Sequence, residues 1–176
     1  DAITSLLKRT HPVPNRLRKD NHREKMLCSI SLQKRILGHL ASTYCVMFDK
    51  TGESIITGSD DKLIKIWKSR TGLLVATLRG HTGEICDLAI NSDNTILASC
   101  SCDKTVRLWS AQSSAELCVL QGHTSSVTSV KFSPYTFQGS NYLISTGDDA
   151  NLFFWRSING TFNKQPTAFC EKIKSS

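Results

Sequence analysis

Short runs rich in Val, Ile, Leu and Thr recur along residues 45–155, and Gly, Asp, Asn and Ser separate them. Such runs, bounded by turn residues and lacking the period of an amphipathic helix, predict strands. The chain is therefore predicted to be all-β. The predicted strands cover residues 45–48, 54–57, 63–67 and 74–78, then 85–90, 95–99, 105–109 and 117–120, then 127–132, 142–145 and 151–155.

The strands belong to an internal repeat. Gly-His pairs begin at residues 38, 80 and 122, and a Trp closes the third strand of each unit, with Trp-to-Trp spacings of 42 and 46. The four additional residues of the third unit fall in the turn-rich stretch 135–141. An acid stands six residues before each Trp and a hydroxyl stands ten before it. The recurring residues are His39, Thr57, Asp61 and Trp67; His81, Ser99, Asp103 and Trp109; and His123, Ser145, Asp149 and Trp155.

Four strands per unit, with Gly-His at one end and Trp at the other, resemble the WD-repeat β-propeller over residues 35–156. The resemblance implies three four-stranded blades, at about 35–75, 76–117 and 118–156. Residues 1–34 are then a basic, extended segment, and 157–176 a polar tail or a truncated continuation. One departure is the missing Asp after each Trp, where Lys68, Ser110 and Arg156 stand.

In that family the His, hydroxyl, Asp and Trp of one unit form a hydrogen-bonded structural set. His, a hydroxyl and Asp are also the residue types of a hydrolytic triad. Catalysis needs one exposed nucleophile, whereas here the combination occurs three times with the hydroxyl in mid-strand, which favours architecture. No phosphate-binding loop, metal-ligand spacing or nucleophile elbow is present. We expect no enzymatic activity, no cofactor and no metal.

The amino-acid sequence of the first unit is similar to that of the bromodomain-and-WD-repeat family in residues 36–39, 44–52 and 57–67. This implies a protein-interaction scaffold in a nuclear, chromatin-associated regulator of transcription and cell shape. The alternative is a propeller subunit of an unrelated assembly, in signalling, RNA processing or substrate recognition by a ubiquitin ligase. Propellers recruited to such ligases often carry Trp-Asp-x-Arg, and residues 67–70 keep only the Trp and the Arg.

Partner proteins of propellers favour the loop before each first strand and the turn before the structural Asp. These positions predict a partner-binding surface at one end of the blades. The candidates are Ser42, Asp60, Glu84, Cys102, Ser126 and Asp148.

Three blades cannot close a ring, since closed propellers hold four to eight. We expect the ring to be completed by further blades or by a second copy of the chain. Residues 35–37 resemble a fourth strand donated to another blade, and the first residue, Asp1, suggests a fragment of a longer protein.

Charge is concentrated near the start. Residues 1–35 contain nine Lys and Arg and three acidic residues, whereas the rest of the chain contains thirteen Lys and Arg and twelve acidic residues. Residues 8–25 are predicted to form a solvated linker, with contact to nucleic acid or an acidic partner as the alternative. The chain has seven cysteines, and no two of them are separated by the two intervening residues usual in zinc or thioredoxin-like sites, which favours reduced thiols in an intracellular protein. No apolar stretch is long enough to span a membrane.

Overall fold

The computed structural model describes residues 31–136, 140–158, 161–162 and 168–170, and the chain divides into two compact units, 1–36 and 37–176. The described residues of the first unit, 31–36, form no strand. The predicted basic segment 8–25 lies outside the described residues. All strands of the described residues lie in the second unit, and the description below concerns that unit.

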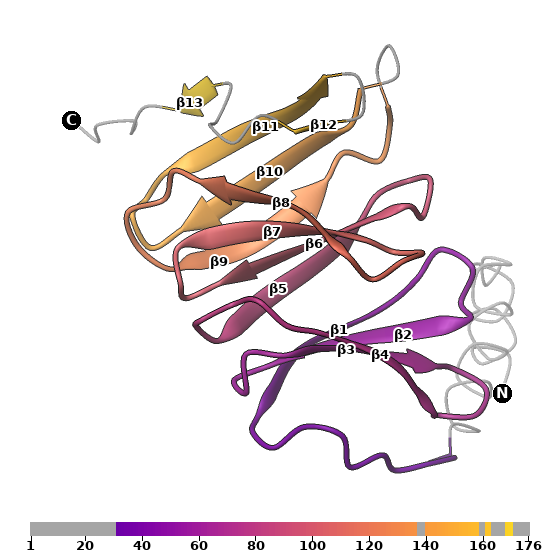
Figure 1. The fold of residues 1–176 in the computed structure, drawn as a ribbon. Coiled ribbons are helices and arrows are strands. Elements are labelled where there is room, and N and C mark those ends of the chain that lie inside the picture. Colours follow the sequence, from indigo (N-terminus) through magenta and orange to yellow (C-terminus); the bar gives the residue numbers. More distant parts are fainter. Residues whose placement is uncertain (1–30, 137–139, 159–160, 163–167, 171–176) are drawn as a thin grey trace, which may run out of the picture. The chain divides into compact units, whose positions relative to one another are not determined.

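Three antiparallel sheets follow one another along the chain (Figure 1). In the first two sheets the strand order in space equals the order in sequence, as expected for strands joined by short turns. The described residues contain no helix, and the prediction of an all-β fold made of four-stranded units is confirmed. The first sheet contains β1 (Thr43–Phe48), β2 (Ser54–Ser59), β3 (Ile64–Lys68) and β4 (Leu74–Leu78). The second contains β5 (Ile85–Ile90), β6 (Ile96–Ser101), β7 (Thr105–Ser110) and β8 (Glu116–Gln121).

The third sheet differs at its outer edge. It contains β9 (Val127–Phe132), β10 (Tyr142–Gly147) and β11 (Leu152–Ile158), and two short strands, β12 (Thr161–Phe162) and β13 (Ala168–Cys170), both pair with β11. Residues 161–162 and 168–170, within the stretch predicted as a polar tail or a truncated continuation, therefore supply the outer edge of this sheet. Residues 35–37, predicted as a donated strand, adopt no strand conformation, because a strand requires a neighbouring ladder of hydrogen bonds.

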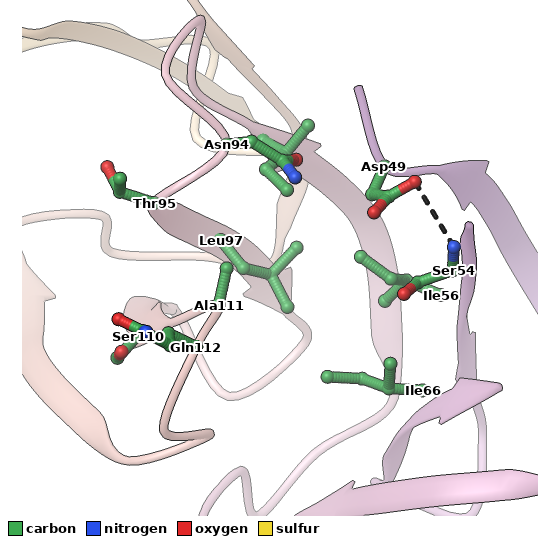
Figure 2. A pocket seen from close by; sticks show the side chains of 11 residues that line it. Asp49, Ser54, Ile56, Ile66, Asn94, Thr95, Leu97, Ser110, Ala111 and Gln112 are labelled. Atoms are coloured by element: carbon green, nitrogen blue, oxygen red, sulfur yellow. Dashed lines mark hydrogen bonds between the residues drawn. The ribbon is translucent and has the colours of Figure 1, made fainter. Parts of the chain in front are cut away.

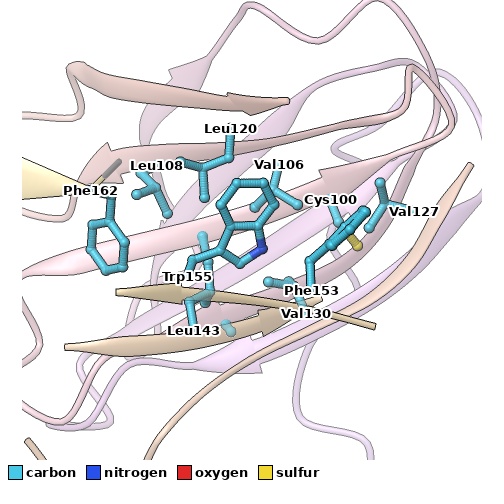
Figure 3. Packing of buried hydrophobic residues seen from close by; sticks show 12 residues of the cluster. Cys100, Val106, Leu108, Leu120, Val127, Val130, Leu143, Phe153, Trp155 and Phe162 are labelled. Atoms are coloured by element: carbon cyan, nitrogen blue, oxygen red, sulfur yellow. The ribbon is translucent and has the colours of Figure 1, made fainter. Parts of the chain in front are cut away.

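The middle sheet is covered on both faces. One face packs Leu88, Leu97 and Trp109 against Ile56 and Ile66 of the first sheet. The opposite face packs Ala98, Val106 and Leu108 against Leu143, Phe153 and Trp155 of the third sheet (Figure 3). Each of these two tryptophans therefore points toward the sheet that precedes its own in sequence.

Among the described residues, no sheet packs on the corresponding face of the first sheet. Tyr44, Val46 and Phe48 alternate along β1 and are exposed to 67%, 68% and 61%. The other residues of this strand, Cys45 and Met47, pack toward the second sheet. A row of exposed apolar side chains on one sheet face is unusual for a solvated surface, and it lies where a preceding sheet would pack.

Candidate functional site

The four recurring residues of each unit lie within hydrogen-bonding distance of one another. The His Nδ1 atoms of His39, His81 and His123 lie 2.8, 2.7 and 2.9 Å from the carboxylates of Asp61, Asp103 and Asp149. The Nε2 atoms lie 2.8, 2.8 and 2.9 Å from the hydroxyls of Thr57, Ser99 and Ser145. The indole N–H groups of Trp67, Trp109 and Trp155 donate to the same hydroxyls at 2.9, 2.8 and 2.9 Å.

The direction of each hydrogen bond follows from what each group can do. A carboxylate only accepts, so the neutral imidazole donates from Nδ1 and accepts at Nε2. The hydroxyl therefore donates its proton to Nε2, and its oxygen accepts the indole N–H. Each polar atom of the set has a partner, which matters because an unpaired buried group costs about 1–3 kcal/mol.

The structural Asp also holds two backbone segments together. Its carboxylate accepts from the amide that follows the His, at 3.2, 3.0 and 2.9 Å in the three units. It accepts as well from the amide two residues after itself, at 3.1, 3.0 and 3.1 Å. The intervening residues Lys62, Lys104 and Ala150 have φ of 67°, 69° and 58°, a left-handed turn conformation that the carboxylate hydrogen bond stabilises. The sequence pattern predicted the Asp but not these backbone partners.

Burial of the sets increases after the first unit. The His side chains are exposed to 5%, 1% and 1% in chain order. Trp67 is 8% exposed, whereas Trp109 and Trp155 are 2% and 1% exposed. The second and third tryptophans are covered by a preceding sheet. Trp67 is instead covered by its own Gly38, where a Cβ would overlap the indole ring, so the Gly of this Gly-His pair allows close packing.

Comparison with known proteins identifies the repeat. The family model of the WD domain, G-beta repeat, matches residues 30–68, 72–110 and 114–156. The chain belongs to the WD-repeat family. Its three sheets are therefore blades of a β-propeller, and three such blades make an incomplete ring.

Relatives of this WD-repeat chain include proteins with different names. A bromodomain and WD repeat-containing protein of Dictyostelium discoideum is 52% identical over 66 residues, 38% of this chain and 3% of the relative. The Protein HIRA homolog of Drosophila melanogaster is 36% identical over 94 residues, 44% of this chain and 8% of the relative. The nuclear distribution protein nudF of Aspergillus flavus is 34% identical over 125 residues, 69% of this chain and 27% of the relative. The chain thus spans at most 27% of the length of these relatives.

Electrostatics favour the ionised form of the structural Asp in each blade. Burial alone would raise the pKa of Asp103, but hydrogen bonds from His81, Thr105 and the Thr82 amide outweigh it and leave the pKa well below its usual value. The pKa values of Asp61 and Asp149 are lowered in the same way, again against the effect of burial. Folding and ionisation of these carboxylates are therefore coupled.

The six residues predicted to bind partners meet in pairs. The amides of Asp60, Cys102 and Asp148 donate to the carbonyls of Ser42, Glu84 and Ser126 at 3.0, 3.0 and 2.9 Å. Each blade therefore presents one pair at the end where its first strand begins. Ser42, Glu84 and Asp148 are exposed, and the other three are half-buried. We call these six residues the strand-start surface.

Sequence reasoning missed one neighbour of this surface. The Sγ atom of Cys86 lies 3.5 Å from that of Cys102, and burial raises the pKa of the Cys86 thiol to about 12, with a further contribution from Cys102. Cys86 is the inserted residue of the β-bulge between Ile85 and Asp87. The bulge points its side chain toward the turn, and the predicted strand 85–90 alone gave no signal for it.

A second missed residue joins two blades. Asp87, on β5, accepts from the Ser129 hydroxyl at 2.8 Å, the Val130 amide at 3.2 Å and the Lys131 ammonium at 2.8 Å, all on β9. Burial would raise the pKa of Asp87, but these donors lower it. The only feature of the sequence that could have indicated this role is the presence of an acidic residue within the otherwise apolar first strand of the unit.

The opposite end of blades 1 and 2 is hollowed. A cavity of about 420 Å³ lies between these blades (Figure 2). Its lining comes from the β1–β2 turn, β2 and β3 of blade 1, and from β5, β6, β7 and the β5–β6 and β7–β8 turns of blade 2. Within the described residues, no group of three or more His, Cys, Asp and Glu side chains is placed to hold a metal ion. That part of the chain also contains no helix long and apolar enough to cross a membrane.

Proposed function

We propose that these blades are part of the protein-interaction scaffold of a nuclear, chromatin-associated regulator of the bromodomain-and-WD-repeat type. The observation that carries the proposal is the 52% identity over 66 residues with a bromodomain and WD repeat-containing protein. The chain is also similar to the Protein HIRA homolog of Drosophila melanogaster and to Protein HIRA of Mus musculus. The role in cell shape rests on the family resemblance alone.

Partner binding is assigned to the strand-start surface. The same backbone hydrogen bond holds each of its three pairs, so the blades present equivalent positions side by side along one end. Among them Glu84 and Asp148 are exposed acids, which suits a partner with basic groups at matching spacing. The basic segment 8–25 adds a second proposed contact, with phosphates or an acidic partner, on the basis of its charge.

No catalytic role is assigned to the repeated sets. Ser99 and Ser145 are exposed to 0% and 1%, and both hydroxyl oxygens already bind an indole N–H and an imidazole. A nucleophile has to reach a substrate atom, and neither oxygen has an open approach. The sets therefore stabilise blades.

A second candidate is a propeller subunit of an unrelated assembly. The match to nudF favours it, because that match covers 69% of this chain whereas the bromodomain-and-WD match covers 38%. The higher identity of the shorter match favours the chromatin assignment.

The test is proximity labelling in cells with the full-length protein fused to a biotin ligase. We expect labelled chromatin proteins, some of which are lost when Ser42, Glu84 and Asp148 are all changed to Arg. The matched control changes Val75, Leu117 and Thr136 to Arg, which are exposed residues outside both the strand-start surface and the cavity between blades 1 and 2, and should retain the labelling. Labelling confined to a non-chromatin assembly would establish the second candidate. Identical labelling by both triple variants would refute the surface.

A further inference from the structure

The cavity between blades 1 and 2 has an apolar floor built by both blades. Ile56 and Ile66 line it from blade 1, and Ile90 and Leu97 line it from blade 2 (Figure 2). Its polar lining residues include Thr95 and the exposed Gln112, which belong to the β5–β6 and β7–β8 turns. It lies at the opposite end of the strands from the strand-start surface.

The equivalent place between blades 2 and 3 is filled. By the repeat spacing, Ile66, Ile90 and Leu97 correspond to Leu108, Phe132 and Leu143, and these three pack in one cluster with Phe162. The rings of Phe132 and Phe162 lie 6.3 Å apart in an edge-to-face arrangement. Phe162 is 8% exposed and lies beside Leu108 (Figure 3). An aromatic ring thus completes this interface.

The two interfaces differ in the connection after the third strand. In blade 3, β11 continues to Ile158 and the chain returns as β12, which pairs Phe162 with Ser157. In blade 2 the residue equivalent to Ser157 is Ala111, and the chain turns there at once, with the Ser110 amide donating to the Ala115 carbonyl at 2.8 Å. The side chains of this turn, residues 111–115, are Ala, Gln, Ser, Ser and Ala. None of them supplies a ring, and the cavity stays open.

We propose that the cleft between blades 1 and 2 binds an aromatic side chain carried by an extended segment of a partner protein, in the position that Phe162 occupies between blades 2 and 3. The apolar floor suits a ring, whose burial removes 150–250 Å² from water as a general magnitude. The exposed Gln112 side chain also lines the cavity, and its amide group can donate to and accept from the backbone of such a segment.

Charge at the mouth restricts the flanking residues of the partner. Asp49 lines the cavity, and although burial would raise its pKa, hydrogen bonds from Thr51, Ser54 and Asn94 lower it and keep the carboxylate ionised. A carboxylate at the mouth repels acidic residues that flank the aromatic residue of the partner, whereas neutral or basic flanking residues are compatible with it. This site is separate from the strand-start surface and does not depend on the chromatin assignment.

The experiment uses the 176-residue chain labelled on its Ile δ1 methyl groups. It is titrated with the acetylated, amidated tripeptide Gly-Phe-Gly and, separately, with Gly-Ala-Gly. We expect the Phe peptide to shift the methyl signals of Ile56, Ile66 and Ile90 saturably, in the roughly millimolar range usual for so small a ligand. The signal of Ile85, which is fully buried at the other end of blade 2, should not move, and the Ala peptide should shift none.

Two matched pairs of variants test the location. Ala111→Phe fills the cleft from within, whereas Ala115→Phe adds the same ring at an exposed position of the same turn. Gln112→Trp covers the mouth without altering the apolar floor, with Ser113→Trp as its control, and it replaces the first pair if Ala111→Phe does not fold. The first member of each pair should lose the shifts and the second should keep them. Equal shifts with the Ala peptide, unchanged binding by Gln112→Trp, or contacts from another segment of the chain in the cleft would overturn the proposal.

Discussion

The carboxylate of Asp103 lies 2.7 Å from Nδ1 of His81, and the same carboxylate holds the turn between β6 and β7. A single side chain therefore joins the loop before the first strand of the blade to the turn between its second and third strands. The same relationship between His and Asp recurs in the blades on either side. It explains why the family pattern fixes an acid six residues before the Trp.

Replacing this carboxylate should destabilise the fold strongly. Asp103→Ala leaves the imidazole N–H of His81, the Thr82 amide and the Thr105 amide without their acceptor. Each unsatisfied buried group costs about 1–3 kcal/mol, and water recovers part of the loss. We therefore expect the free energy of unfolding to fall by about 3 kcal/mol. Urea denaturation of the chain measures this. Asp93→Ala, at an exposed turn position, is the control and should stay within about 0.5 kcal/mol of the parent. A similarly small effect of Asp103→Ala would contradict the role assigned to the carboxylate.

Acid should destabilise the blades over a defined range. The folded pKa values of Asp61, Asp103 and Asp149 lie below the value of about 3.9 for an unfolded Asp. A lowered folded pKa gives stability that is fully present above the unfolded pKa and is lost as pH falls through the folded pKa. Thermal melts should therefore be insensitive to these groups between pH 7 and about 5 and fall steeply below about pH 4. Asp103→Asn should have a lower melting temperature than the parent at pH 7, and its melting temperature should fall less on acidification. An equal fall in variant and parent would argue against this linkage.

The hydrogen-bonded set of blade 1 should contribute less to the stability of the fold than the set of blade 2. Trp109 is 2% exposed beneath a neighbouring blade, whereas Trp67 is 8% exposed and is covered by Gly38 and not by a described sheet. Trp109→Phe removes the indole N–H from the Ser99 hydroxyl and leaves a void, at an expected cost of about 2 kcal/mol. Trp67→Phe should cost about 1 kcal/mol, because water replaces part of the lost contact. Calorimetry of both variants gives the order, and a larger cost for Trp67→Phe would show that its face is covered in solution.

Periodicity predicted most of the fold, because three units repeated the same positions. The predicted strand 85–90 coincides with β5, and the predicted strand 127–132 coincides with β9. Features found in one blade alone escaped prediction. Asp87 joins β5 to β9 through contacts between residues about 42 positions apart, and no local pattern encodes such a pairing. β12 was missed because a two-residue strand gives no period, and its position depends on the hairpin that β11 forms.

Phe162, on the strand β12 that the sequence did not predict, fills between blades 2 and 3 the place that is open between blades 1 and 2. Its removal should therefore create a second cleft. Phe162→Ala removes a ring that is 8% exposed and packs edge-to-face with Phe132. The expected loss of stability is about 3 kcal/mol, because a large buried ring is replaced by a void. The same Gly-Phe-Gly peptide should then bind between blades 2 and 3 and raise the melting temperature of the variant more than that of the parent, since a ligand that binds only the folded state stabilises it. Phe154→Ala, a ring that is 38% exposed, is the matched control and should gain no such site. If the peptide stabilises both variants equally, Phe162 does not mark an aromatic-binding position and the analogy between the two interfaces fails.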